Sequence, residues 1–569
     1  MDVHMPPNAG DTQAPAQPPA TPPAVVVHHA NAVNYSNGEL VWTARDSAAE
    51  ESARRVRREE IVFILKHASS RGYFVYSLAE GSGRTANNGN VGDSDGDTPP
   101  FELSVLSALQ LPEGLLAEFL IDEIPGHLRS DGLQSWLHVI VSTRSGIGQA
   151  PSFFDGVLHP LLEALGLAPL GLGLADPAGE SWSRSESGSE EGGTARYHYR
   201  YQLTVTQSSN TIRDFARGLA EGADGKANRR QPGENGAVVV TPSRTVVLLS
   251  GDGGIIDLLN GLDKPATTHF TPPTIAVLPL GTGNALFHSL HKPPHYTAAA
   301  AGDTTAGAAP STLVLGLRTL FRGVSAPLPT FKATFSPRSR LISFPEPVLN
   351  DGPPAPPASN STTPNPEPEP THISHLLGAI VASYGFHASL VWESDTPAYR
   401  VHGDKRFGMA AAELLKLSHA YDAAVETRAR GSAKWAKVRT RGGRFNYVLA
   451  TMVSNLEKTF TISPASRPLD GQLRLVSFGG VGGEKTMEIM MAAYRGGEHV
   501  GMRWGEGEEE DGVGYDEVEE VRVTIDEEDP RWRKVCIDGT IVEVEKGGWM
   551  TVGRADEERL KVLVDRSVL

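Results

Sequence analysis

Residues 245–290 read TVVLLSGDGGIIDLLNGLDKPATTHFTPPTIAVLPLGTGNALFHSL, and this stretch decides the fold. Two short apolar runs, 246–249 and 275–278, each lead into a glycine-rich turn that opens an amphipathic segment of helical period. The glycines leave room for an anion to approach the backbone, and the N–H groups of a following helix point towards it. The stretch therefore predicts two strand–loop–helix units whose paired loops suit phosphate groups.

Upstream of this stretch, the alternation of strand and helix occurs twice more. The apolar run 137–141 is followed by a Gly/Ser loop and an amphipathic segment, and the run 201–205 precedes another. Strands that alternate with helices four times predict a parallel sheet with helices on both faces. In such a sheet the ligand binds beyond the carboxyl ends of the strands. We therefore expect an α/β nucleotide-binding lobe over residues 135–295.

The rest of the chain divides by composition. We expect a disordered Pro- and Ala-rich tail (1–24), a small β-rich appendage (25–130) and an antiparallel, β-sandwich-like lobe (311–569) with a disordered proline-rich insertion (345–371). Within the last lobe, the runs 312–323 and 560–565 are predicted as strands, and the Ala/Leu-rich run 407–429 as one long helix. The predicted fold class is thus α/β plus β.

Composition narrows the functional class. The formal net charge of −16 argues against nucleic-acid binding through a general basic surface. The single cysteine, Cys536, allows no internal disulfide and fits a reducing compartment. The N-terminus has no basic segment followed by an apolar one, and no window reaches the roughly 18 continuous apolar residues of a membrane span. We therefore expect a cytoplasmic protein without a transmembrane segment, whose contact with intracellular membranes is peripheral.

The first glycine loop places one carboxylate, Asp252, among glycines. Such an aspartate is either a helix cap or turn former, or a base held at the end of a strand. The second loop, PLGTGN at 279–284, offers the Thr282 hydroxyl and the Asn284 amide, a kind of backbone nest that takes phosphate oxygens. An acid beside such a loop favours general-base activation of a hydroxyl for phosphoryl transfer. By contrast, SGIGQA at 145–150 lacks the third glycine of a dinucleotide fingerprint and reads equally as a strand-to-helix turn.

These motifs, in this order, resemble the diacylglycerol kinase catalytic domain superfamily and, within it, the sphingosine (sphingoid long-chain base) kinases of fungal type. SGDGGIIDLLNGL at 250–262 is similar to the family motif (S/G)GDG-x-x-x-E-x-x-NGL, and LPLGTGNAL at 278–286 to P-x-G-(S/T)-GN-x-(L/A). The resemblance covers roughly residues 137–564. It implies a lipid kinase that uses ATP and Mg²⁺.

The resemblance assigns roles to individual positions in the α/β lobe. Asp252 takes the place of the general base, Asp257 replaces the family's glutamate with a side chain one methylene shorter, and Asn260 keeps the asparagine of NGL. The positions that fall in the family's nucleotide-binding loops, one of which has lost the family's Asn-Pro pair, are Ser142, Thr143, Arg144, Ser145, Thr206, Ser250, Gly251, Gly253, Gly254, Gly281, Thr282, Gly283 and Asn284. No side chain is assigned as a metal ligand.

Further nucleotide-binding positions fall in the β-rich lobe. Arg400 and Arg406, in YRVHGDKRF, take the places of phosphate-binding arginines, although without the family pattern they read equally as surface residues. Asp538 begins the family's terminal DGE motif, which here ends in Thr540 and so lacks one carboxylate on the nucleotide side.

Two substitutions bear on the substrate. The acidic positions that meet the amino and hydroxyl groups of a sphingoid base are occupied here by Ser389 and Val391. We expect transfer of the γ-phosphate of ATP to a primary lipid hydroxyl, with a sphingoid base as first candidate. Diacylglycerol or ceramide kinase activity is the alternative, and a catalytically weak nucleotide- and lipid-binding homologue is another. A kinase of the NAD kinase type is disfavoured because the resemblance extends into the β-rich lobe.

Overall fold

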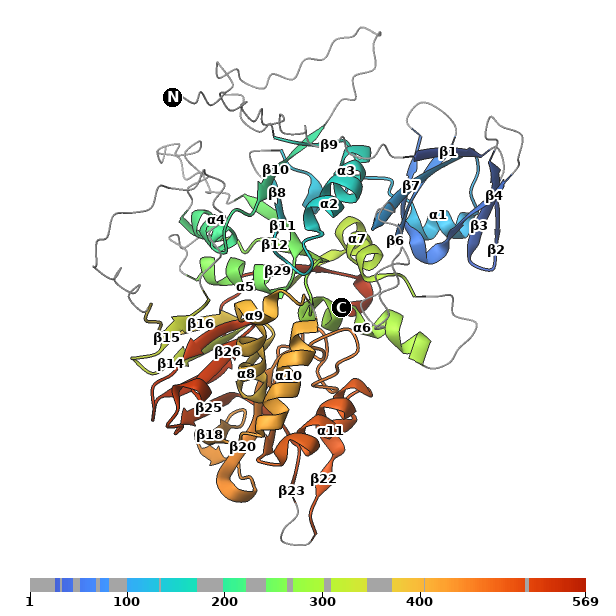
Figure 1. Cartoon of the computed structure of the whole chain (residues 1–569). Helices are drawn as coiled ribbons and strands as arrows, with labels where there is room; N and C mark the ends of the chain where they lie inside the picture. The colour runs from blue at the N-terminus through green and yellow to red at the C-terminus, as the bar shows by residue number, and fades with distance from the viewer. Residues whose placement is uncertain are drawn as a thin grey trace, which may run out of the picture.

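The computed structural model describes residues 26–30, 33–44, 52–67, 72–80, 100–131, 135–170, 198–221, 242–263, 270–300, 309–344, 371–403, 405–506 and 511–569. The predicted N-terminal tail and nearly all of the proline-rich insertion lie outside these residues. Figure 1 shows a small N-terminal unit, an α/β part next to it, and a larger β-rich part on the other side of the α/β part.

The N-terminal unit is built mainly of strands. Its elements are β1 (Val26–Ala30), β2 (Asn34–Ser36), β3 (Glu39–Ala44), β4 (Ser52–Arg57), β5 (Ile61–Lys66), β6 (Tyr73–Glu80), β7 (Phe101–Ala108) and the short helix α1 (Glu113–Phe119). The strands form one sheet of order β1-β7-β6-β5 and another of order β2-β3-β4. Residues 61–64 of β5 are wholly buried, because this strand is covered by the helix α1 on one side and by the α/β part on the other.

A mainly parallel sheet of order β13-β29-β12-β11-β8-β10-β9 forms the centre of the α/β part. Its strands are β8 (Ser135–Val141), β9 (Leu167–Pro169), β10 (Tyr199–Val205), β11 (Ser243–Ser250), β12 (Thr274–Pro279), β13 (Val324–Pro327) and β29 (Lys561–Val564). Strand β11 runs parallel to both of its neighbours, β8 and β12. Its residues 245–250 are all buried, as expected for a strand covered on both faces.

Helices cover both faces of this sheet, as Figure 1 shows. They are α2 (Ala150–Phe153) and α3 (His159–Ala164), joined by a π-helical turn, with α4 (Thr211–Glu221), α5 (Asp252–Gly261), α6 (Ala285–Ala300) and α7 (Thr312–Arg322). Alternate residues of β11 point to opposite faces. Val247 and Leu249 pack in one apolar cluster with α2, α3 and α7, while Val246 and Leu248 pack in another with α4, α5 and α6. The predicted parallel sheet with helices on both faces is confirmed.

The β-rich part contains a large, curled antiparallel sheet. Its strands are β14 (Phe331–Phe335), β15 (Arg340–Ile342), β16 (His375–Gly378), β17 (Val381–Gly385), β18 (Tyr421–Arg428), β19 (Trp435–Lys437), β20 (Arg444–Thr451), β21 (Leu473–Gly479), β24 (Gly514–Val518), β25 (Glu520–Ile525), β26 (Lys534–Ile537), β27 (Thr540–Glu543) and β28 (Trp549–Arg554). The ribbon of β22 (Arg503–Trp504) and β23 (Asp511–Gly512) and the helices α8 (Phe386–Ser394), α9 (Pro397–Arg400), α10 (Lys405–Leu417) and α11 (Gly482–Tyr494) complete it. The sheet curls around its own apolar core.

One sequence-based prediction of a strand and one of a helix need correction. Residues 312–322 form the helix α7, because the Ser311 hydroxyl caps the Val314 N–H and apolar residues recur at helical spacing. The predicted long helix at 407–429 ends at Leu417, since Tyr421, Ala423 and Val425 alternate with less buried residues and form β18.

The last strand of the chain was assigned to the wrong lobe. β29 is a strand as predicted, but it pairs in parallel with β12 and so belongs to the sheet of the α/β part. It also pairs with β13, in antiparallel orientation. The chain therefore leaves the α/β part after α7, builds the β-rich part, and returns to close the first sheet.

Candidate active site

A cleft of about 630 Å³ lies at the carboxyl ends of strands β8, β10 and β11, between the α/β part and the β-rich part. Its walls include the predicted nucleotide-binding residues Ser142, Thr143, Arg144, Ser145, Thr206, Ser250, Gly253, Gly254, Thr282, Arg400 and Arg406, together with Asp257. The structure thus brings these positions, which are far apart in sequence, around one space.

Hydroxyl groups connect the strand ends at the floor of the cleft. The Ser145 hydroxyl donates to Ser142 Oγ at 2.8 Å and lies 3.1 Å from the Ser250 hydroxyl, so the loops after β8 and β11 are joined. The Thr143 backbone N–H donates to Thr206 Oγ1 at 3.0 Å, which joins the loop after β8 to the end of β10. These bonds fix three loops relative to one another.

The two glycine loops lie directly against each other. A Cβ atom on Gly251 would come within 2.9 Å of Gly281 Cα, so both positions require glycine for this contact. Gly253 differs, because nothing lies within 4 Å of the position of its missing Cβ, which faces the cleft. Of these glycines, Gly253 is the one that leaves space for a ligand, whereas Gly251 and Gly281 let the loops pack.

Asn284 holds its own loop in shape. Its Oδ1 accepts from the Gly281 N–H at 3.0 Å, and its Nδ2 donates to the Gly281 carbonyl at 2.8 Å. The residue has a positive φ of 51°, a conformation that asparagine tolerates better than most residues. Gly283 lies between this asparagine and Asp252, and a Cβ there would be 3.7 Å from Asp252 Oδ2.

Asp252 begins helix α5 but caps a different helix, α6. Its Oδ2 accepts from the Ala285 N–H at 2.7 Å and its Oδ1 from the Leu286 N–H at 3.1 Å. The side chain is half-buried, and this burial raises the pKa of the carboxyl while the two backbone hydrogen bonds lower it. Each carboxylate oxygen keeps a lone pair, so Asp252 can accept a further hydrogen bond while it caps α6.

Asp538 faces Asp252 from the β-rich part. It sits in the tight turn between β26 and β27, with a φ of 48°, and accepts hydrogen bonds from the N–H groups of Ala379, Ile380 and Val381. Burial raises its pKa to about 7, and the charge of Asp252 adds to this rise. The charge of Asp252, in the α/β part, therefore reaches a second buried carboxylate in the β-rich part.

Two of the arginines on the cleft wall, Arg400 and Arg406, share one partner, Asp395, which also lines the cleft. Arg400 donates from Nε and Nη2 to the two oxygens of Asp395, at 3.0 and 2.6 Å. Arg406 donates from Nη1 to Asp395 Oδ1 at 3.0 Å. Guanidinium groups form paired hydrogen bonds with phosphate oxygens as they do with carboxylates, so the chemistry of both arginines suits a phosphate.

Two other motif residues, Asp257 and Asn260, make hydrogen bonds with other elements of the chain. Asp257 accepts from Arg213 on α4 at 3.0 Å. The Asn260 side chain makes two hydrogen bonds with the backbone of Leu377 on β16, each of 2.9 Å, and thereby ties α5 to the β-rich part.

The predicted substrate positions lie on α8, behind the cleft wall. Ser389 is buried, and its Oγ accepts from the Tyr421 hydroxyl at 2.8 Å. Val391 packs in a small apolar cluster with Ala388 and Cys536. Neither is among the described residues that line the cleft.

Two cleft residues carry no recognisable sequence signal. Ser343 and Phe344 follow β15, next to the proline-rich stretch, and Phe344 stacks on Trp392 with ring centroids 4.1 Å apart. The sequence analysis also did not single out Asp395, although its place between Glu393-Ser394 and Tyr399-Arg400 could have indicated it.

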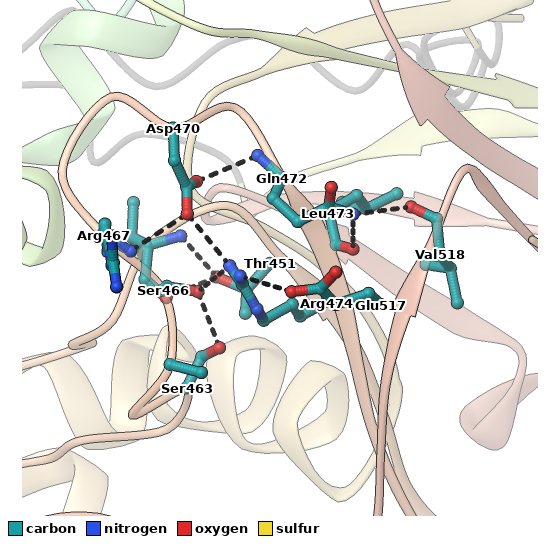
Figure 2. Close-up of polar contacts among 12 residues, drawn as sticks. Thr451, Ser463, Ser466, Arg467, Asp470, Gln472, Leu473, Arg474, Glu517 and Val518 are labelled. Carbon is teal, nitrogen blue, oxygen red and sulfur yellow. Dashed lines mark hydrogen bonds and ion pairs between the residues drawn. The ribbon is translucent and has the colours of Figure 1, made fainter. Parts of the chain in front are cut away.

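A separate, small apolar cavity of about 20 Å³ lies beside the two acids. Its lining includes Leu286, whose N–H binds Asp252, Ala379, whose N–H binds Asp538, and the loop 467–471. Figure 2 shows how this loop is held: the buried Arg474 donates to Ser466 Oγ and to Asp470, and pairs with Glu517 at 2.7 Å.

One comparison with known proteins bears on the two glycine loops. A family model described as the diacylglycerol kinase catalytic domain matches residues 178–313, which contain both glycine loops. This stretch of the chain is thus similar to the catalytic domain of diacylglycerol kinases. No curated protein gives a significant match to the chain.

Solved structures of the same class resemble the chain at low identity. A diacylglycerol kinase from Bacillus anthracis str. Sterne is 10% identical, with 76% of this chain and 98% of that chain covered and a TM-score of 0.38. Another structure assigned to the same class, from the same strain, is 12% identical with the same coverage and a TM-score of 0.39. Of the helices that the structure describes, none is long and apolar enough to cross a membrane.

Proposed function

We propose that this protein is an ATP-dependent lipid kinase that transfers the γ-phosphate to the primary hydroxyl of a lipid, with a sphingoid base as the first candidate. One observation carries the proposal: Leu286 and Ala379, whose N–H groups hold Asp252 and Asp538, line one small cavity at the junction of the two lobes. Beside it lies the cleft that two arginines and the strand-end loops enclose. An acid, a phosphate-sized recess and fixed cations are the parts that phosphoryl transfer needs.

Asp252 is the residue proposed to remove the proton from the acceptor hydroxyl. Its two bonds to the first N–H groups of α6 fix the direction of the carboxylate and place it at the positive end of a helix dipole. The open space at Gly253 and the start of helix α5 form the recess for phosphate oxygens. Arg400 and Arg406, held by Asp395, neutralise the charge of the phosphoryl group.

The carboxylates of the site suit the Mg²⁺ that accompanies ATP in kinases. Mg²⁺ in kinase sites is held by one or two carboxylates, by phosphate oxygens and by water, and it neutralises charge on the transferred group. Asp252 and Asp538 supply two such carboxylates. Among the described residues no group of three metal-ligating side chains is gathered, so the nucleotide phosphates would complete the coordination.

The apolar surroundings of the two acids support a lipid as the acceptor. The small cavity beside them is lined by Leu286, Leu290, Leu328, Met452 and Leu469, among others. Its volume of about 20 Å³ holds no lipid chain, so binding of a chain requires displacement of the loop 467–471.

A neutral lipid alcohol, such as diacylglycerol or ceramide, is the second candidate. Ser389 and Val391 bring no carboxylate to the positions where the sphingosine kinase pattern has acids, and Ser389 is already bonded to Tyr421. A cationic amino group therefore finds no charged partner at these two positions, which favours an uncharged head group.

A lipid substrate implies contact with a membrane surface. Two adjacent helices, α10 and α11, carry exposed apolar side chains that could make this contact. Met487, Met491 and Tyr494 are exposed at helical spacing on α11, and Met409 and Leu417 are exposed on α10. We propose peripheral contact through these side chains from the cytoplasmic side, where the buried thiol of Cys536 would stay reduced.

The test is a transfer assay with purified protein, labelled ATP and Mg²⁺ against sphingoid bases, ceramide, diacylglycerol and NAD. Label in a sphingoid base supports the first proposal, and label in ceramide or diacylglycerol supports the second. ATP binding without transfer to any lipid would indicate a catalytically weak homologue. Phosphorylation of NAD alone would replace the lipid kinase proposal.

A further inference from the structure

A second cleft, of about 580 Å³, lies on the other side of the α/β part, where the N-terminal unit meets it. Its walls come from α1 and the segment that follows it, from helix α7, and from the 3₁₀ turn η9 (Arg566–Val568) at the C-terminal end. In Figure 1 the C-terminal end lies beside α6 and α7, near the N-terminal unit. None of its lining residues also lines the first cleft.

Three arginines converge on this second cleft. Arg318 and Arg322 are one turn apart on α7 and so share a helix face, and Arg566 comes from η9. They are close enough to affect one another, because the charge of Arg322 lowers the pKa of Arg318 and that of Arg566 lowers the pKa of Arg322, in both cases after the larger effect of burial. These like charges repel one another, and an anion bound between them would be attracted by all three.

Only one of the three has its donors taken up by the protein. Arg318 donates to the carbonyls of Ile61 and Arg58, at 2.8 and 2.7 Å, and its guanidinium lies over the Phe119 ring. In contrast, the guanidinium groups of Arg322 and Arg566 make no hydrogen bond or ion pair with any residue that the structure describes.

The acidic residues of the same walls are engaged elsewhere. Glu118 forms a two-pronged pair with Arg58, Asp122 pairs with Lys66 at 2.6 Å and Glu123 pairs with Arg129 at 2.9 Å. Asp565 accepts hydrogen bonds from the backbone and the hydroxyl of Ser567. Glu118 and Asp565 raise the pKa of Arg322, so their charge reaches it, but neither makes a hydrogen bond with it.

We propose that the second cleft is a binding site for a phosphate-bearing ligand, with Arg322 and Arg566 as its charge partners. Guanidinium groups match phosphate oxygens in pairs, and two of them from different elements give a defined orientation. The cleft is larger than a phosphate alone requires, and Phe119, Leu120, Leu315 and Val568 line it with apolar surface. The ligand class is therefore a phosphate attached to an apolar group, such as a phospholipid, or a free phosphate.

This site would contact the middle of helix α6, whose first turn holds the proposed base. The first N–H groups of α6 bind Asp252, and His291 of the same helix lines the second cleft, where it contacts Thr319 of α7 at 2.9 Å. The N-terminal unit and the C-terminal turn thereby acquire a role: together with α7 they build the walls of this site.

The test measures binding without ATP, so it is independent of the proposed kinase activity. Three probes are titrated: inorganic phosphate, soluble short-chain phosphatidic acid, and vesicles of phosphatidylcholine with or without phosphatidic acid. The variant is Arg322→Gln with Arg566→Gln, both at exposed positions, and each single variant is tested too. Arg495→Gln, an exposed arginine on the β-rich part that pairs with Glu498 at 2.7 Å, is the matched control.

We expect the double variant to lose at least about tenfold in affinity for the bound probe, as for loss of charge-assisted hydrogen bonds. The Arg495→Gln control keeps the affinity of the unchanged protein, and a variant of the first cleft, Arg400→Gln with Arg406→Gln, measures how much of the binding the first cleft contributes. Binding of inorganic phosphate alone identifies a free phosphate as the ligand, and binding of phosphatidic acid alone identifies a lipid. The proposal is overturned if no probe binds, if the double variant binds as tightly as the unchanged protein, or if only the first-cleft variant loses binding.

Discussion

The side chain of Asn260 on α5 makes two hydrogen bonds with the backbone of Leu377 on β16, each 2.9 Å long. The same amide also donates to the Ile256 carbonyl. Asn260 therefore fastens the α/β part to the β-rich part, a few residues along the helix that Asp252 begins.

Replacing Asn260 by alanine leaves the N–H and C=O groups of Leu377 without these partners. We expect Asn260→Ala to lower the free energy of unfolding by about 1–3 kcal/mol, the cost of unsatisfied partly buried polar groups. Urea denaturation measures this change, and hydrogen exchange at the Leu377 amide locates it. Asn34→Ala, at an exposed position on β2, should stay within about 0.5 kcal/mol of the unchanged protein. Equal stability of both variants would contradict the role of Asn260 in fastening the two parts together.

Asp395 should act as a positioning residue for two arginines of the cleft. Asp395→Asn weakens the bonds that fix Arg400 and Arg406, while the local charge becomes more positive. We expect kcat to fall by about tenfold or more, without a rise in the KM for ATP, because charge stabilisation depends on fixed donors. Steady-state kinetics separate the two constants.

The matched control for Asp395 is Asp422→Asn. Asp422 pairs with Arg444 at 3.6 Å, at a half-exposed position away from the cleft. Neither variant should lose more than about 1 kcal/mol of stability, since exposed ion pairs contribute little. A kcat equal to that of the unchanged protein in Asp395→Asn would rule out the positioning role.

Asp538 makes stability depend on pH in the acid-to-neutral range. Its folded pKa of about 7 lies above the usual value of about 3.9 for an unfolded aspartate, so the folded state holds the proton more tightly. The stability that this group contributes is fully present below pH 4 and is lost as pH rises through 7. We expect the free energy of unfolding of the unchanged protein to fall between pH 5 and pH 8 for this reason.

The Asp538→Asn variant should show a flatter pH profile, because it has no proton to lose. Urea unfolding at several pH values measures the slope, and Asp556→Asn, at an exposed site near the same end of the chain, should keep the original slope. A profile for Asp538→Asn that is parallel to that of the unchanged protein would show that another group is responsible.

The glycines of the two loops should respond differently to the same substitution. In Gly281→Ala the new Cβ would overlap the backbone of Gly251, so the loops must separate, and we expect a loss of about 1–3 kcal/mol in stability. In Gly253→Ala the Cβ meets open space within α5, so stability should be kept or rise by up to about 1 kcal/mol.

The variant that keeps its stability, Gly253→Ala, is the one that we expect to bind ATP more weakly. The added methyl of Gly253→Ala stands in the recess proposed for phosphate, so ATP should bind more weakly although the fold is intact. Thermal unfolding and ATP titration of both variants test the pair. Unchanged ATP affinity in Gly253→Ala would place the phosphates elsewhere.

The sequence was most informative where glycine, strand and helix patterns repeat. The four strand–helix units and the place of both glycine loops follow from hydrophobic periodicity, because buried parallel strands read as apolar runs. The same reasoning failed for α7, whose apolar residues also read as a strand, and for β18, which follows a helix without a strong break. A pattern that is local in sequence does not distinguish such cases.

Relationships between distant segments could not be predicted from the sequence. Nothing local indicates that β29 crosses back to pair with β12, that Asp252 caps α6 rather than its own helix, or that Phe344 reaches the cleft. These features arise from packing in three dimensions and not from propensity.

The most direct test of the central claim compares Asp252→Asn with the unchanged protein in transfer of label from ATP to lipid. Asp214→Asn, at an exposed position on α4 where Asp214 pairs with Arg217 at 2.7 Å, serves as control, and unfolding curves show that all three proteins are folded. We predict that Asp252→Asn binds ATP but transfers label at least about 10²-fold more slowly to the lipid that the unchanged protein accepts. Full turnover by Asp252→Asn with that lipid would contradict the account.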